Sequence, residues 1–156
     1  MISSLSAPGA NGKRSLVVPI FVGGTIAGGL DLISAFLIYG WGVPRAIAGG
    51  LLGRQALHGG DGPWVLGVFL QFFIALSAAA IYCLASNRMK FLKENFIVCG
   101  LFYGIAVFLV MNLVVLPLCA LHVTGPYELR DLIRGLLVHM LIIGLPISFS
   151  AWKFAK

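Results

Sequence analysis

The sequence predicts an all-α integral membrane protein with four transmembrane helices and a short interfacial or re-entrant helix between the first and second. Composition is the first reason: of 156 residues, 60% are hydrophobic and only 10% are charged, against about 25% charged in a soluble domain. The second reason is that the apolar residues gather into four runs, each long enough for the roughly 20-residue helix that crosses a bilayer. A soluble core of this size could not bury so much apolar surface, so lipid is the expected solvent.

The four runs cover approximately residues 16–41, 64–85, 96–121 and 132–152. We assign residues 16–152 to a single transmembrane domain. Several ends of these runs carry an aromatic residue, as in the aromatic belts of membrane proteins: Trp41, Trp64, Tyr127 and Trp152. Residues 1–15 then form a cytoplasmic N-terminal segment, and residues 153–156 form a short cytoplasmic tail.

The connection between the first two runs is too long for a simple turn. Pro44 suits the first turn of a helix, and Ile47, Leu51 and Leu52 give that helix apolar side chains. These features predict a short helix that lies on the outer leaflet or dips into it. The following HGGDGP segment (58–63) is expected to be a flexible loop.

The distribution of lysine and arginine predicts that both termini lie in the cytoplasm. Positive residues concentrate on the cytoplasmic side of membrane proteins. The side of the two termini carries Lys13, Arg14, Arg88, Lys90, Lys93, Lys153 and Lys156, whereas the other side carries Arg45, Arg54, Arg130 and Arg134. Because the net charge of +6 is spread in these short clusters, we expect no nucleic-acid partner. The expected partners are the lipid bilayer and either further copies of the chain or a larger membrane complex.

No motif points to a cofactor or to catalytic residues. Cys83, Cys99 and Cys119 show no C-x-x-C pair and no zinc spacing, so we interpret them as free thiols that fill small apolar spaces. His58 and His122 fall near the outer surface, which argues against an axial haem pair. We therefore expect no metal and no cofactor.

Each run carries one strongly polar residue: Asp31, Gln71, Asn112 and His139. Asp31, for example, stands in the middle of GGTIAGGLDLISAFL (23–37). At a rise of 1.5 Å per residue, all four lie roughly 10–15 Å below the outer boundary of the bilayer. The sequence thus predicts a polar layer in the outer half of the bundle.

The polar residues lie on or near stripes of small residues, where membrane helices pack closely. In the first and third runs these stripes include the G-x-x-x-G pairs Gly24, Gly28, Gly100 and Gly104. We expect the four glycines to serve helix packing within the chain, although such faces also suit homo-oligomers. The polar residues should then face protein and not lipid.

Two interpretations of the polar layer remain open. In the first, it is a structural clasp in which Asp31 bonds His139 while Gln71 and Asn112 complete the network, since a lone carboxylate at mid-membrane costs about 2.5–3.5 kcal/mol. In the second, it is a proton or ligand site, because aspartate and histidine can exchange a proton near neutral pH. We expect a non-enzymatic protein, either transporter-like or sensing or a structural subunit. The alternative is an integral-membrane enzyme or an accessory subunit of a membrane enzyme complex.

Three segments carry a resemblance to known proteins: AIAGGLLG (46–53), LGVFLQFFIAL (66–76) and YGIAVFLVMNLVVLPL (103–118). Over roughly residues 20 to 150 the chain resembles small four-span bacterial inner-membrane proteins of unknown function, and it is distantly similar to the YagU-like inner-membrane proteins. In these relatives a histidine often stands where Gln71 stands here, and one occupies a place like that of His139. The resemblance implies the four-span fold and its location but no reaction, and the glutamine argues against a two-histidine site.

Overall fold

The computed structural model describes residues 16–123, 125 and 128–154, and these residues form helices and no strand. Four helical stretches are long and apolar enough to cross a membrane: Val17–Tyr39, Asp61–Arg88, Phe96–Leu118 and Leu129–Phe154. The all-α class with four such stretches is therefore confirmed. The predicted N-terminal segment 1–15, the aromatic belt residue Tyr127 and the last two residues of the tail lie outside the described residues.

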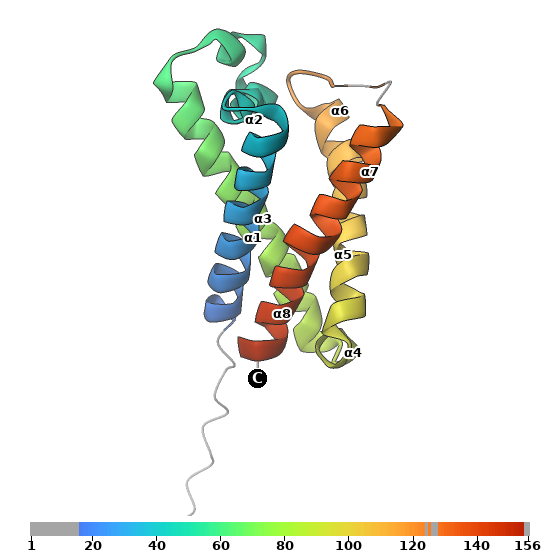
Figure 1. Ribbon diagram of the computed structural model, residues 1–156. Helices are drawn as coiled ribbons and strands as arrows, with labels where there is room; N and C mark the ends of the chain where they lie inside the picture. Colours follow the sequence, from blue (N-terminus) through green and yellow to red (C-terminus); the bar gives the residue numbers. More distant parts are fainter. Residues whose placement is uncertain (1–15, 124, 126–127, 155–156) are drawn as a thin grey trace, which may run out of the picture.

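The first half of the bundle consists of two long helices with a shorter one against their upper end (Figure 1). Helix α1 (Val17–Tyr39) ends at Gly40, whose φ of 84° is a conformation that glycine adopts without strain. Helix α2 (Val43–Leu52) and a 3-10 turn, η1 (Arg54–His58), follow. Helix α3 (Asp61–Arg88) then packs along α1 and against α2.

The prediction of a loop over residues 58–63 is wrong for residues 61–63, because α3 begins at Asp61 and not near Trp64. An aspartate in the first turn of a helix is stabilised by the positive end of the helix dipole. Pro63 is tolerated there because the first turn has no intrahelical partner for its missing N–H. Both residues therefore favour an earlier helix start than hydropathy alone predicts.

The second half is made by the third and fourth long stretches, and each is interrupted by a π-helical segment. The third consists of α5 (Phe96–Val110), the π-helix η2 (Met111–Val115) and α6 (Leu116–Leu118). The fourth consists of α7 (Leu129–Val138), the π-helix η3 (His139–Gly144) and α8 (Leu145–Phe154). A single turn, α4 (Phe91–Glu94), joins the two halves at the lower end.

Both π-helical segments come shortly before a proline, Pro117 or Pro146. A proline has no N–H for the carbonyl four residues earlier, and its ring collides with that carbonyl. The preceding turns widen in response, which converts them to π-helix. The widened turns contain Asn112 and His139, two residues of the predicted polar layer.

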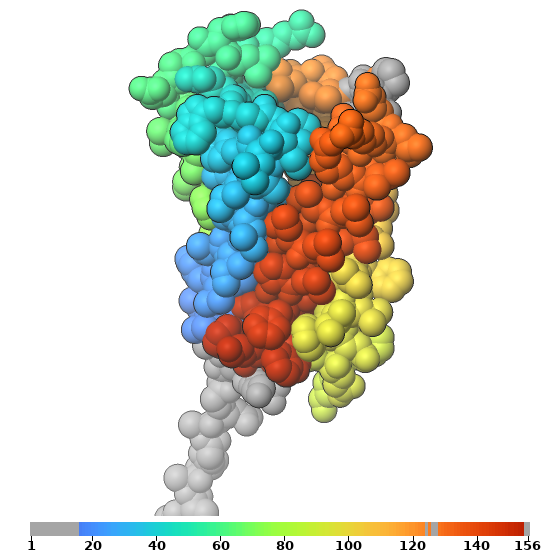
Figure 2. All heavy atoms as spheres, viewed as in Figure 1, coloured from blue at the N-terminus to red at the C-terminus, as the bar shows by residue number. Residues whose placement is uncertain are grey.

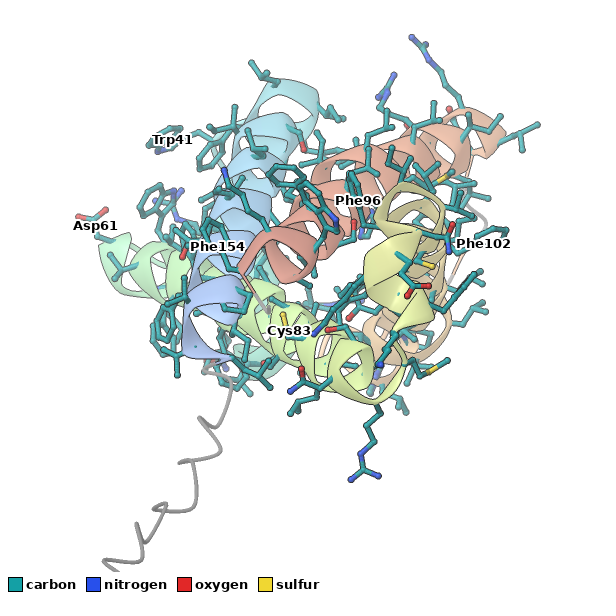
Figure 3. The ribbon with its side chains drawn as sticks, turned by 90° about the horizontal axis from the view of Figure 1, so that it is seen from below. Trp41, Asp61, Cys83, Phe96, Phe102 and Phe154 are labelled. Atoms are coloured by element: carbon teal, nitrogen blue, oxygen red, sulfur yellow. The ribbon has the colours of Figure 1, made fainter. Side chains whose placement is uncertain are left out.

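The two halves are held together in the lower part of the molecule. Helix α8 packs against both α1 and α5, and the buried core there is built largely from small side chains such as Ala27, Ala79 and Ala151. Two hydroxyls tie neighbouring helices together: Tyr103 Oη donates to the Ala78 carbonyl at 2.7 Å, and Ser150 Oγ donates to the Pro19 carbonyl at 2.9 Å. Viewed from below, Cys83 lies inside this core whereas Phe102 projects outward (Figure 3).

The glycines of the two G-x-x-x-G pairs lie where helices cross. A Cβ atom on Gly28 would stand 2.9 Å from the Ala75 Cβ of α3, and one on Gly24 would stand 2.8 Å from Leu76. Gly100 and Gly104 allow α5 to approach the backbone of η3 in the same way. In this structure both pairs thus serve packing within one chain.

Toward the upper end the two halves diverge, so that α1 and α2 stand apart from α7 (Figure 1). One backbone hydrogen bond bridges them at the top, from the Ala120 N–H to the Gly50 carbonyl at 2.8 Å. Beside it the Leu121 side chain packs against Gly49. The start of α1 and the end of α8 both lie at the opposite, lower end.

Candidate functional site

A cavity of about 450 Å³, here called the polar cavity, lies between the diverging halves. All four residues of the predicted polar layer line it: Asp31 from α1, Gln71 from α3, Asn112 from η2 and His139 from η3. Each of these side chains is half-buried. In the side view of Figure 2, α2 and the end of α1 stand beside α7 in the upper part of the molecule.

Asp31 is bonded to Gln71 and not to His139, so the expected Asp31–His139 pair is wrong. Gln71 Nε2 donates to Asp31 Oδ2 at 2.6 Å. The physical reason is that α1 packs directly along α3, whereas α1 and the upper part of the fourth stretch diverge. The side chain that can reach the carboxylate is therefore the glutamine.

His139 and Asn112 each bond a carbonyl of their own helix, four residues earlier. His139 Nδ1 lies 2.8 Å from the Gly135 carbonyl oxygen, and Asn112 Nδ2 donates to the Phe108 carbonyl at 2.9 Å. Because the carbonyl oxygen can only accept, Nδ1 is the donor in this contact. The Phe108 ring meets the His139 ring edge-on, with centroids 5.5 Å apart.

The cavity has further lining residues that sequence reasoning missed. Ser34 lines it one turn after Asp31, and its Oγ donates to the Asp31 main-chain carbonyl at 2.8 Å. A three-residue spacing from Asp31 on one helix face is a signal that could have identified it. Asp131 lines the upper part of the cavity and pairs with Arg134 at 3.5 Å, with both side chains more than a third exposed.

The rest of the lining is largely apolar and includes Ile38, Ile47 and Leu116. Among residues 16–123, 125 and 128–154, no group of three or more His, Cys, Asp or Glu side chains is placed to hold a metal ion. The cavity thus combines two carboxylates, two amides, one imidazole and the hydroxyls of Ser34 and Tyr39 with an apolar wall. Such an arrangement is suited to binding and orienting a small molecule.

Comparison with protein-family models, with curated proteins and with solved structures finds no match for this chain. The resemblance to the YagU-like proteins therefore stays a prediction. The geometry and chemistry of the polar cavity carry the functional argument.

Proposed function

We propose that this chain is a four-span protein of the bacterial inner membrane with both termini in the cytoplasm. In this proposal the polar cavity faces the periplasmic half of the bilayer and binds a small solute there. The role is non-enzymatic and is that of a small transporter-like or sensing protein. Helix α2 lies at the outer interface in this arrangement.

The outward surface of the bundle supports membrane insertion. Large apolar side chains are exposed on every long stretch, among them Phe21, Phe69, Phe102 and Leu141. Contiguous exposed apolar surface of this extent is uncommon in soluble monomers but suits contact with acyl chains.

The ends of the bundle support the proposed orientation. Arg88, Lys90, Lys93 and Lys153 lie beside the turn α4 and the end of α8, which share the lower end with the start of α1. This end is the one expected in the cytoplasm. At the upper end, Phe36, Trp41 and Trp64 stack with neighbouring ring centroids 4.7 and 5.2 Å apart, as in an interfacial aromatic belt.

The single observation that carries the binding role is that one polar residue from each long stretch lines one cavity. Polar side chains within a membrane are costly, and they commonly mark substrate or ion pathways. A volume of about 450 Å³ lies within the roughly 300–1,000 Å³ of small-molecule sites. A clasp would close Asn112 and His139 around Asp31, but both instead bond their own helices and leave space between them.

One contact favours a second candidate, a structural subunit that has no ligand. The short Gln71–Asp31 hydrogen bond joins α1 to α3 and can fix the register of the two helices. In that case the carboxylate matters only as a hydrogen-bond acceptor, which an asparagine oxygen can replace.

Two substitutions of Asp31 separate these candidates. We expect Asp31→Leu to lower the detergent thermal stability, because it leaves Gln71 without its partner at a cost of about 1–3 kcal/mol. Asp31→Asn retains an acceptor and should keep thermal stability near that of the parent. If the cavity binds a ligand through the carboxylate, Asp31→Asn should nevertheless fail to complement the phenotype of a deletion strain. Full complementation by Asp31→Asn would contradict the binding role and favour the structural subunit.

A further inference from the structure

We infer that the polar cavity selects a small organic cation with an apolar body. This inference names the ligand class of the site and rests on the proposed binding function. Three properties of the cavity lead to it: its free hydrogen-bonding atoms, its uncompensated charge, and its size with respect to its apolar wall.

The free hydrogen-bonding atoms of the cavity are mainly acceptors. Ser34 uses its only O–H on the Asp31 carbonyl, and His139 Nδ1 donates to the Gly135 carbonyl. Gln71 and Asn112 each use one N–H on a protein oxygen. What remains toward the cavity is the Asp31 carboxylate, the Nε2 of a neutral imidazole and the two amide oxygens, which accept, together with one N–H on each amide and the Tyr39 hydroxyl. A ligand that donates hydrogen bonds is complementary to this set.

The charge of the cavity is also unbalanced. Within the described part of the chain Asp31 has no lysine or arginine partner, and its hydrogen bond comes from a neutral amide. Asp131, the second carboxylate of the lining, is already paired with Arg134. A carboxylate inside a membrane is stabilised by an opposite charge, and a cationic ligand supplies that charge.

Size and lining distinguish an organic cation from a metal ion. A bound metal ion is enclosed by several oxygen ligands at short range. In this cavity of about 450 Å³ one of the two carboxylates, Asp131, is already paired with Arg134, and no three ligating side chains gather among the described residues. Ile38, Ile47 and Leu116 provide contact for a hydrocarbon body, and the Phe108 ring can face a cationic group. The fitting ligand is an amine or a quaternary ammonium with an apolar substituent.

A pair of charged thiol reagents tests this inference on the full chain in intact cells. In a Cys119→Ala background, Ser34→Cys places a thiol in the cavity, and Gly60→Cys places one on the exposed upper connection. The rates of modification by trimethylammonium-ethyl and by sulfonato-ethyl methanethiosulfonate are compared at each site. We expect the ratio of the cationic to the anionic rate at Ser34→Cys to exceed that at Gly60→Cys by about tenfold, which 1.4 kcal/mol of Coulomb energy produces.

Two further measurements link this preference to Asp31 and to a ligand. Adding Asp31→Asn should bring the rate ratio at Ser34→Cys down to the Gly60→Cys value. Benzyltrimethylammonium should slow modification of Ser34→Cys, whereas the neutral benzyl alcohol should not. Neither compound should change the rate at Gly60→Cys.

The possible failures are distinguishable. If neither reagent modifies Ser34→Cys while both modify Gly60→Cys, the cavity is not accessible, and the proposed function fails together with the inference. If both reagents react at Ser34→Cys but show the Gly60→Cys ratio, the cation inference alone is overturned. A ratio insensitive to Asp31→Asn, or a lack of protection by benzyltrimethylammonium, overturns it equally.

Discussion

Asp31 reaches Gln71 because the residues beside it on α1 are small. Gly24 and Gly28 bring the α1 backbone against Leu76 and Ala75 of α3, at distances that a larger side chain would prevent. At that separation Gln71 Nε2 lies 2.6 Å from the carboxylate. The small residues thus set the distance between α1 and α3, and this distance allows the hydrogen bond from Gln71 to Asp31.

A glycine substitution tests this packing at a single residue. We expect Gly104→Ala to lower the free energy of unfolding by about 1–3 kcal/mol, because the added Cβ would overlap the backbone of His139 and Met140. That backbone can move only if the fourth helical stretch moves. Gly29→Ala is the matched control, since a Cβ there meets nothing within 4 Å, and alanine favours helix over glycine. Thermal unfolding in detergent should separate the two, and equal stabilities would contradict the packing.

At this scale the sequence predicted which residues share the cavity but not how they pair. The four-residue spacing from glycines and alanines places Asp31, Gln71, Asn112 and His139 on inward faces, and the structure brings all four to one cavity. The bond from Asp31 to Gln71 depends on which helices are neighbours and how far each is rotated. Hydropathy along one chain contains no such information, so the clasp interpretation named a partner on the wrong helix.

At the scale of the helix, the local sequence determines where some helices form, whereas tertiary packing determines the helix type elsewhere. Pro44 and the apolar residues after it predict a short helix on the outer leaflet; α2 (Val43–Leu52) lies in this segment, and its place at the interface stays a prediction. Pro117 and Pro146 predict a disturbance, but the chain alone does not reveal that the turns before them widen into π-helix. The result depends on how the freed carbonyls find new partners, which is settled only once α5 packs against η3.

The bridge between α2 and the end of the third stretch gives a prediction for these elements. A Cβ on Gly50 would lie 3.6 Å from the Cβ of Cys119 and 4.0 Å from its sulfur. Disulfides join Cβ atoms about 3.5–4.5 Å apart. In the proposed orientation this contact lies in the periplasm, which is oxidising, so we expect Gly50→Cys to form a disulfide with Cys119 during growth. The bond is measured as a reduction-sensitive mobility shift, or as loss of thiols available to a maleimide after denaturation.

The control for this disulfide is Gly60→Cys, which lies at the same end but where a Cβ meets no atom within 4 Å. It should leave Cys119 reduced. Free thiols at Gly50→Cys even after mild oxidation of purified protein would contradict the contact between α2 and residue 119. A disulfide that forms only after purification would instead place the upper end in a reducing compartment and reverse the proposed orientation.

At the scale of the whole molecule, the lower part is closed and the upper part is open. Tyr103 and Ser150 tie helices together below, where small residues fill the core. Above, the halves separate around the polar cavity and are joined again by the bridge between Gly50 and Ala120. Composition predicted four membrane-length helices, but the divergence of the two halves could not be predicted, because it depends on the crossing geometry of η3 with α5.

A cysteine scan along α1 tests most directly whether the polar cavity is open to water within an apolar outer surface. In a Cys119→Ala background, single cysteines are placed at positions that line the cavity, Ser34, Ala35 and Ile38, and at outward positions of the same depth, Leu30, Ile33 and Leu37. A membrane-impermeant maleimide is then applied to intact cells. We predict labelling at the three cavity positions and none at the three outward positions, which contact lipid in the proposed arrangement. Labelling of the outward set, or equal protection of both sets, would contradict a water-accessible cavity between the two halves of the bundle.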